Sequence, residues 1–484
     1  IACCVIFLGW FVSGTAMMYW RLPVFSAAER LATLPELSSE RVRIDAAEAW
    51  GRTGEKGAPR AVVLTSLQGE PVYRFTAGGE GWITVSATDG RVRRRFRWEE
   101  AQGSVPVVAG NARWYLEETL KGPDQWTLSR IYEAHRPLYK VAVEDGAGTV
   151  LYVSSATGEV VNRTTTVSRW QGFVSAILHW IYPTVLRQFD EFWRQFVIWL
   201  SLLGCVMCVL GMAVGIWRSS PSRKYKMRDK GPTWSPYLGQ KRWHHWGGLA
   251  FGLVTFTWAL SGAFSLNPGR LSPGTGPTPA MEKLWSGGAL KLEGARPEWP
   301  AGTREVEYRT YQGSTYYLFH AAGVPVQYSR QFDAEELLRL AERAMPGRRV
   351  TEKVQLADYD WYYYDLKTRK KNLPVWRLKF DDPEETWLYV DPKSGQIAAR
   401  YEAASRRHRW LYHGLHSLDF PFLYLNRPWW DVIVIGLSLG GILLSWTGVW
   451  IGWQRVRQMA RQRAAATRER ERRGVPVAAM GTGD

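Results

Sequence analysis

The chain has 484 residues, a formal net charge of +17 and 27 tryptophans. The length allows several domains, and the positive charge taken alone would suit a nucleic-acid-binding protein. The position of the charge argues against nucleic acid, because much of it lies beside long apolar runs and tryptophan concentrates where a membrane meets water. The composition therefore predicts an integral membrane protein that contacts lipid and has no nucleic-acid partner.

Four apolar runs are each long enough to cross about 30 Å of hydrocarbon, which takes about 20 residues of helix. The first run could also be a cleaved signal peptide. Ile1 is not an initiating methionine, so we expect further residues to precede it in the natural protein. The predicted spans are residues 1–20, 196–217, 243–266 and 429–453.

Basic residues lie on one side of these spans. The segment 218–242 holds eight Lys or Arg and one acidic residue, and the tail 454–484 holds eight arginines. Short basic loops stay on the cytoplasmic side. Both termini are then cytoplasmic, the long segments 21–166 and 267–402 lie outside, and the tail forms a solvated helix that touches anionic lipid.

The sequence repeats at a fixed interval along the chain. Leu151-Tyr152-Val153 recurs as Leu388-Tyr389-Val390, and Leu178-His179 recurs as Leu415-His416 (416 − 179 = 237). We call this interval the repeat separation. The matches continue without a gap as far as Gly211 in the first copy. We predict two tandem repeats of span, outer domain, short apolar hairpin and span, related by a pseudo-two-fold axis along the membrane normal.

Both outer domains are predicted to be α+β. Glycines in tight turns separate β-prone segments, which is typical of hairpins, and apolar residues at helical spacing predict helices. A stretch rich in Pro and Gly predicts a loop. The predicted hairpins are residues 81–93, 149–161 and 386–397, the helices 25–50 and 332–344, and the loop 270–302.

Three sequence motifs resemble the PepSY-associated transmembrane family. Leu151 to Val160 resembles the end of a PepSY domain, the run Lys241-Arg-Trp-His-His-Trp-Gly-Gly-Leu249 resembles the family's opening span, and Tyr412 to Pro421 resembles the motif before its last span. The resemblance covers nearly the whole chain. It implies two PepSY-like periplasmic domains on four spans in the bacterial inner membrane. It also implies an iron-regulated protein with b-type haem, similar to ferric-siderophore reductases.

Five of the eight histidines lie at the predicted membrane edges, where ionisable residues are costly and indicate function. His179 and His416 lie in the segments 167–195 and 403–428, which are too short for spans and predict interfacial or re-entrant hairpins. Because repeat-related residues face each other across the axis, we predict that these two imidazoles bind one haem iron near the outer face. An ordinary interfacial or helix-capping role is the alternative.

His413 precedes His416 by three residues and should share its helix face. It is an alternative ligand, a partner of a haem propionate or a contact to substrate. On the inner side, His244 and His245 begin the third span, and the family pattern His-x-Trp-x-Gly favours His244 as the ligand of a second haem.

The second ligand of that inner haem is not evident. His244 precedes Ser261-Gly262 by seventeen residues, and the first span contains a similar pair, Ser13-Gly14. Counting back seventeen residues from Ser13 passes Ile1. We therefore expect a matching histidine to precede the given chain.

Two haems are expected because one cofactor at one face cannot serve both sides of a layer about 30 Å thick. Electrons would come from quinol or a cytoplasmic reductase, and the outer acceptor would be a ferric siderophore. One alternative is a non-enzymatic PepSY module that regulates an envelope peptidase. Another is a small-solute transporter, which is disfavoured because the cores of the spans hold no charged residue for a coupling ion.

Overall fold

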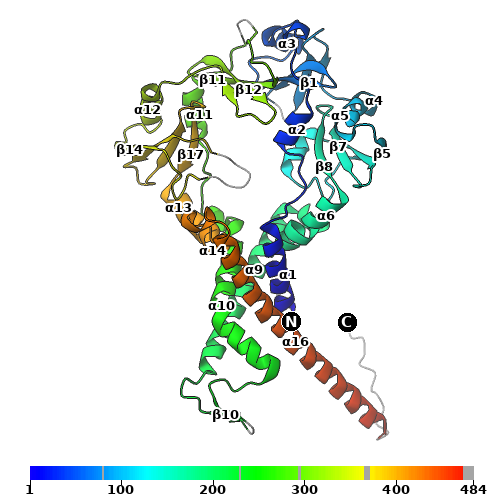
Figure 1. Ribbon diagram of the computed structural model, residues 1–484, viewed down its shortest axis with the longest axis vertical. Coiled ribbons are helices and arrows are strands. Elements are labelled where there is room, and N and C mark those ends of the chain that lie inside the picture. The colour runs from blue at the N-terminus through cyan, green and yellow to red at the C-terminus, as the bar shows by residue number, and fades with distance from the viewer. Residues whose placement is uncertain (79–80, 228–229, 293–295, 365–370, 473–484) are drawn as a thin grey trace, which may run out of the picture.

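The computed structural model describes residues 1–78, 81–227, 230–292, 296–364 and 371–472 (Figure 1). Two lobes lie at one end of a stalk of apolar helices, and the basic loop and the C-terminal part of α16 lie at the other end (Figure 1). The stalk consists of α1 (Ala2–Met17), α9 (Asp190–Trp217), α10 (Gly239–Ser265) and α16 (Trp429–Arg472).

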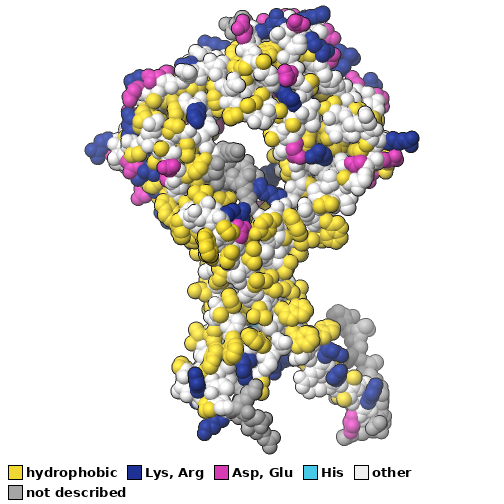
Figure 2. Space-filling view, viewed as in Figure 1, with side chains coloured by type: hydrophobic (Ala, Val, Ile, Leu, Met, Phe, Trp, Pro, Cys, Tyr) yellow, Lys and Arg dark blue, Asp and Glu magenta, His cyan; other side chains and the backbone are white. Residues whose placement is uncertain are grey.

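Three of the stalk helices, α9, α10 and α16, are long and apolar enough to cross a membrane. Helix α1 is apolar but has 16 residues, which reach only about 24 Å at 1.5 Å per residue. The first predicted span, residues 1–20, is therefore a shorter helix than expected. Figure 2 shows apolar side chains around the stalk and its junction with the lobes, while charged side chains gather at both ends.

The stalk helices pack closely because glycines lie where they meet. A Cβ atom added at Gly440 would overlap the ring of Phe251, and one added at Gly441 would overlap the ring of Phe11. Small residues allow such approach in membrane helices, where van der Waals packing replaces the hydrophobic effect between helices. Helix α10 thereby contacts both α9 and α16, and α1 contacts α16.

The ends of the stalk helices differ from the prediction. Helix α9 begins at Asp190 rather than at residue 196, with Asp190 and Glu191 in its first turn, where acidic side chains complement the helix dipole. Helix α10 begins at Gly239 rather than at residue 243. Helix α16 continues beyond the fourth span to Arg472, with exposed side chains over 453–469; the last part of the predicted tail, 473–484, lies outside the described residues.

Each lobe contains a four-stranded antiparallel sheet with its strands in chain order. The predicted turns at Gly158 and Gly395 are confirmed, with φ of +71° and +67°, a region that glycine enters without strain. The strands of the first sheet are β5 (Arg113–Leu120), β6 (Leu138–Glu144), β7 (Val150–Ser154) and β8 (Val160–Thr164). Those of the second are β14 (Val350–Leu356), β15 (Val375–Phe380), β16 (Trp387–Asp391) and β17 (Gln396–Tyr401).

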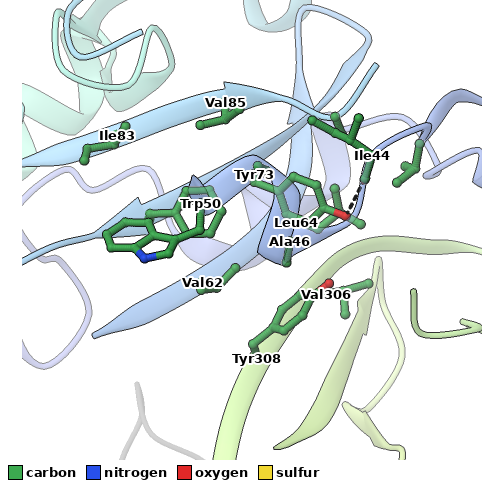
Figure 3. Close-up of a cluster of buried hydrophobic side chains, with 14 of the residues drawn as sticks. Ile44, Ala46, Trp50, Val62, Leu64, Tyr73, Ile83, Val85, Val306 and Tyr308 are labelled. Carbon is green, nitrogen blue, oxygen red and sulfur yellow. Dashed lines mark hydrogen bonds between the residues drawn. The ribbon is translucent and has the colours of Figure 1, made fainter. Parts of the chain in front are cut away.

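A seven-stranded sheet joins the two lobes, with strands from both of the predicted outer segments, 21–166 and 267–402. Strand β1 pairs with β11, so that Val62 lies opposite Tyr308 and Leu64 opposite Val306. Their side chains meet in one core (Figure 3), where the Tyr73 hydroxyl donates to the Ile44 carbonyl at 3.1 Å. In sheet order the strands are β13 (Gln327–Tyr328), β12 (Ser314–Ala321), β11 (Thr303–Tyr311), β1 (Ala61–Leu67), β2 (Glu70–Thr76), β3 (Trp82–Ser86) and β4 (Val92–Arg93).

Two local predictions were wrong. The segment 25–50 is not one helix but α2 (Ala27–Thr33) and α3 (Ala46–Arg52), because Pro35 disfavours the helical conformation of Leu34. The predicted loop 270–302 contains α11 (Pro279–Ser286), which the Thr278 side chain caps.

The predicted helix at 332–344 is confirmed as α12 (Ala334–Arg343). The predicted hairpins at 81–93, 149–161 and 386–397 are present as β3–β4, β7–β8 and β16–β17. The remaining short elements outside the apolar hairpins are α4 (Trp98–Ala101), α5 (Val105–Ala109), β9 (Tyr225–Met227), β10 (Lys230–Thr233) and the 3₁₀ turns at 39–41, 102–104, 130–135 and 268–270.

Candidate functional site

Two short helical hairpins connect the lobes to the stalk. The helices of the first hairpin recur in the second hairpin at the repeat separation. Each hairpin contains one π-helical turn, a feature that is frequent at functional sites. The chain then reverses through a left-handed residue, Ile181 (φ +50°) in one hairpin and Leu418 (φ +48°) in the other. The first hairpin contains α6 (Thr166–Gly172), the π-turn Phe173–Ile177, α7 (Leu178–Trp180) and α8 (Thr184–Arg187); the second contains α13 (Ala403–Arg409), the π-turn Trp410–Gly414, α14 (Leu415–Ser417) and α15 (Pro421–Tyr424).

Indole groups fix each hairpin to the helix that follows it. The Trp193 Nε1–H donates to the carbonyl oxygens of Trp180 and Ile181 at 3.1 and 2.9 Å. The Trp430 Nε1–H donates to the carbonyl oxygen of Ser417 at 2.8 Å. These bonds satisfy backbone groups at the reversal of the chain, where no helical partner is available, and they hold the hairpins that carry His179 and His416.

His179 is held by a backbone carbonyl and a hydroxyl of α1. Its Nδ1 lies 3.2 Å from the carbonyl oxygen of Trp10 and 3.2 Å from the hydroxyl oxygen of Ser13. A carbonyl oxygen can only accept, so Nδ1 carries the proton and Nε2 keeps its lone pair. Gly14 provides the space, because a Cβ atom there would lie 3.2 Å from Cε1 of His179.

His416 is held in the same way by α10. Its Nδ1 lies 3.2 Å from the carbonyl oxygen of Trp258 and 3.1 Å from the hydroxyl oxygen of Ser261, and a Cβ atom at Gly262 would lie 3.6 Å from its Cε1. Each of these three α10 residues follows its α1 counterpart at one constant interval (262 − 14 = 248). Both imidazoles are therefore fixed as the tautomer whose Nε2 can bind a metal.

The two rings lie at a distance that suits a shared metal ion, with their planes inclined at 61°. The centroids of His179 and His416 are 5.9 Å apart. A metal–imidazole bond is about 2 Å long, so two imidazoles on opposite sides of one metal have centroids roughly 6 Å apart. The structure thus brings together the two histidines that the sequence analysis paired.

An apolar cavity of about 510 Å³ surrounds this pair. This volume is in the range of sites for cofactors and drug-sized ligands, roughly 300–1,000 Å³. We call it the outer cavity. It is lined by Phe7, Trp10, Phe11, Gly14, Met17, Met18, His179, Trp180, Tyr182, Trp193, Val197, Ser201, Thr255, Trp258, Ala259, Gly262, Ser265, Leu266, Tyr412, His416, Ser417, Trp430, Val434 and Ser438.

A second cavity of about 510 Å³ lies nearer the basic loop, and His244 lines it. We call it the inner cavity. Nδ1 of His244 lies 3.1 Å from both the carbonyl oxygen of Leu444 and the hydroxyl oxygen of Thr447. A Cβ atom at Gly448 would lie 3.2 Å from its Cε1. The carbonyl, the hydroxyl and the glycine occupy the same relative positions, i, i+3 and i+4, as those that hold His179 and His416.

His245 also lines the inner cavity but has partners at both ring nitrogens. Its Nε2–H donates to the carbonyl oxygen of Gly215 at 2.8 Å, and its Nδ1 accepts from the Ser235 hydroxyl at 2.8 Å. Because Nε2 carries the proton and the lone pair of Nδ1 is engaged, His245 links the basic loop to the end of α9. Of the two candidates, the geometry favours His244 as a ligand.

His413 does not line either cavity. It lies in the π-turn Trp410–Gly414, and its ring packs beside that of Tyr412 at 4.3 Å. The expectation that it shares a face with His416 assumed an α-helix; the wider π-turn changes the angle between residues three apart. Tyr412, rather than His413, lines the outer cavity beside His416. The sequence analysis missed this residue, although a side chain four positions before His416 is expected on the same helix face.

Buried polar contacts tie each lobe to its hairpin. In the second lobe, the Tyr364 hydroxyl donates to one carboxylate oxygen of Asp419 at 2.6 Å. The guanidinium of Arg409 donates to the second carboxylate oxygen of Asp419 at 3.2 Å. Burial raises the pKa of the Asp419 carboxyl and that of the Tyr364 hydroxyl. In the first lobe, the Gln125 amide donates to the carbonyl oxygen of Tyr182 at 2.9 Å. Each lobe is therefore anchored beside the outer cavity.

Among the residues that the structure describes, no group of three or more His, Cys, Asp or Glu is arranged to hold a metal ion. The free Nε2 lone pairs of His179 and His416 and the apolar walls of the outer cavity fit a haem, which these two imidazoles would hold. At the inner cavity, His244 is the residue that would hold such a group.

Comparison with known proteins identifies one domain. Residues 333–401 match the PepSY family model, described as "Peptidase propeptide and YPEB domain". The match covers α12 and the sheet β14–β17, so the chain contains a PepSY domain in its second lobe. A search of curated proteins found no match.

Proposed function

We propose that this protein is a haem-b electron carrier of the bacterial inner membrane that reduces an acceptor on its outer side, a ferric siderophore above all. The observation that carries the proposal is the pair of opposed imidazoles of His179 and His416, 5.9 Å apart in an apolar cavity. Haem bound there would supply a one-electron carrier with bis-imidazole ligation.

The chain's own residues would set the properties of that carrier. The carbonyl oxygens of Trp10 and Trp258 accept from Nδ1–H and make each imidazole a stronger donor, which favours ferric over ferrous iron. The apolar walls exclude water and oppose this effect by disfavouring the more highly charged ferric state. The balance of these two effects would set the redox potential of the haem, so residues of α1 and α10 would control that potential.

The proposed topology has four membrane-crossing helices in two tandem repeats, with both termini in the cytoplasm and both lobes in the periplasm. Its support is that the basic segments and the lobes lie at opposite ends of the stalk (Figure 1) and that the hairpin elements recur at the repeat separation. The outer cavity then lies on the periplasmic side and the inner cavity on the cytoplasmic side, where quinol or a reductase would deliver electrons.

The proposed acceptor site lies between the lobes. Figure 2 shows an opening between the lobes above the hairpins, and both lobes are anchored to the hairpins that carry His179 and His416. Reduction of ferric to ferrous iron weakens its binding to hard oxygen ligands, so one electron would release iron from a siderophore. The protein would thus be a ferric-siderophore reductase.

The visible spectrum of the purified protein, before and after dithionite, tests the proposal. We expect the absorbance bands of a six-coordinate b-type haem and their reoxidation when ferrioxamine is added. Protein that is colourless after expression with ample haem would contradict the proposal. Reduced haem that ferrioxamine does not reoxidise would contradict the proposed acceptor alone.

A second candidate function is the regulation of an envelope peptidase, which the name of the matching family model favours. The PepSY domain at 333–401 would then bind the peptidase, and the cavities would be empty of cofactor. A peptidase that co-purifies with colourless protein, and whose activity changes when it is added back, would favour this function over electron transfer.

A further inference from the structure

The outer and inner cavities meet at two residues of the stalk. Among the described residues, only Phe7 of α1 and Thr255 of α10 line both cavities. They occupy corresponding positions of the two helices, at the same interval as Ser13 and Ser261 (255 − 7 = 248). The two cavities therefore share one side chain from each of two helices, and the larger of the two is an aromatic ring.

The ring of Phe7 is fixed in this place by a glycine. Phe7 is 8% exposed, and a Cβ atom at Gly204 of α9 would lie 2.7 Å from its Cζ atom. The ring therefore rests against bare backbone and cannot withdraw toward α9. On its other side it packs against Trp10, whose ring centroid is 5.8 Å away and which also lines the outer cavity.

Phe11 provides a natural comparison. It lies one turn further along α1, is 6% exposed, and rests against Gly441, the counterpart of Gly204 at the repeat separation (441 − 204 = 237). It lines the outer cavity but not the inner one. Phe7 and Phe11 thus share residue type, burial and packing, and differ in whether they separate the two cavities.

We propose that Phe7 is the bridge through which electrons pass between the two cavities. The inference rests on the proposed function and deepens it. One electron would pass from a ferrous iron held in the inner cavity, which would become ferric, to a ferric iron held in the outer cavity, which would become ferrous. No proton or other reactant would be needed. Transfer rates fall steeply with the gap between donor and acceptor, and a buried ring in van der Waals contact with both cavities shortens that gap.

The test measures how fast an injected electron redistributes between the two centres. A photogenerated 5-deazariboflavin radical delivers one electron to the oxidised protein, and the absorbance change that follows reports the redistribution. Variants His416→Ala and His244→Ala, which should each lose one centre, supply the reference spectra. We expect Phe7→Leu to slow the redistribution several-fold. Phe11→Leu, which changes the wall of the outer cavity alone, should slow it much less when protein of equal haem content is compared.

A second pair of variants moves the rings without replacing them. Gly204→Ala displaces Phe7 and should slow the redistribution, whereas Gly441→Ala displaces Phe11 and should slow it much less. An unchanged rate in Phe7→Leu, or equal slowing in Phe7→Leu and Phe11→Leu, would overturn the bridge while leaving the haem proposal intact. A wild-type protein that binds no haem would overturn the proposed function and the bridge with it.

Discussion

The outer and inner cavities are built on the same local arrangement but are completed differently. In the outer cavity, α1 and α10 each present a carbonyl, a hydroxyl and a glycine, and each holds one imidazole. In the inner cavity, α16 presents this arrangement to His244. The corresponding positions on α9 in the first repeat, Met207, Leu210 and Gly211, also line the cavity, but no described atom lies within 4 Å of a Cβ atom at Gly211.

The difference bears on how a duplicated chain would build the proposed haem sites. Each copy would contribute half of such a site, and the site would be complete where both halves supply a histidine. The described residues complete the outer site with His179 and His416, whereas at the inner site they supply only His244. The outer site should therefore hold haem in a single, well-defined geometry, and the inner site should depend entirely on one histidine.

Removal of an axial ligand should have the largest effect. We expect His179→Ala and His416→Ala each to lose the outer haem, about half of the total if both cavities are filled. His413→Ala should retain full haem content because His413 lines neither cavity. The haem content per protein, measured as the pyridine haemochrome, checks this. If the His413 variant lost as much haem as the His416 variant, the assignment would be wrong.

The inner cavity gives the next largest contrast. His244→Ala should lose the inner haem, whereas His245→Ala should keep it and loosen the basic loop, since His245 bonds to Gly215 and Ser235. Haem content together with proteolysis of the loop distinguishes the two roles. The assignment of His244 as the ligand at the inner cavity would be wrong if His245→Ala abolished binding of the inner haem and His244→Ala did not.

A smaller effect should follow from filling the space beside an imidazole. Gly14→Ala places a methyl group 3.2 Å from Cε1 of His179, and Gly262→Ala places one 3.6 Å from Cε1 of His416. We expect the first to shift the low-spin EPR signal of the outer haem more than the second. Gly436→Ala is the control, because no described atom lies within 4 Å of its Cβ position. Equal spectra for all three variants would show that the glycines do not position the rings.

Loss of a hydroxyl should have the smallest effect. In Ser13→Ala or Ser261→Ala the carbonyl of Trp10 or Trp258 still accepts from Nδ1–H, so the ligand stays in place. We expect the midpoint potential of the outer haem to rise by roughly tens of millivolts, which is about 1 kcal/mol or less for one electron. Spectroelectrochemical titration measures it, with Thr447→Val as the corresponding change at the inner site.

Much of the fold could be predicted from local patterns. Long apolar runs, a basic loop and a constant repeat separation predicted the stalk, the hairpins and the pairing of His179 with His416. Turn glycines such as Gly158 and Gly395 predicted the strands around them. In each case the cause is local: membrane thickness sets the length of a run, and tight turns need residues that tolerate a positive φ.

The tertiary structure alone decided which atoms complete the sites. The acceptors that orient the imidazoles of His179 and His416 are backbone carbonyls of Trp10 and Trp258, and a carbonyl is the same in every residue, so no sequence pattern marks it. The π-turn that moves His413 out of the cavity depends on packing around the hairpin. The pairing of β1 with β11 joins segments that lie far apart in the chain. Such contacts arise only when the whole chain is folded, because their free energy comes from partners distant in sequence.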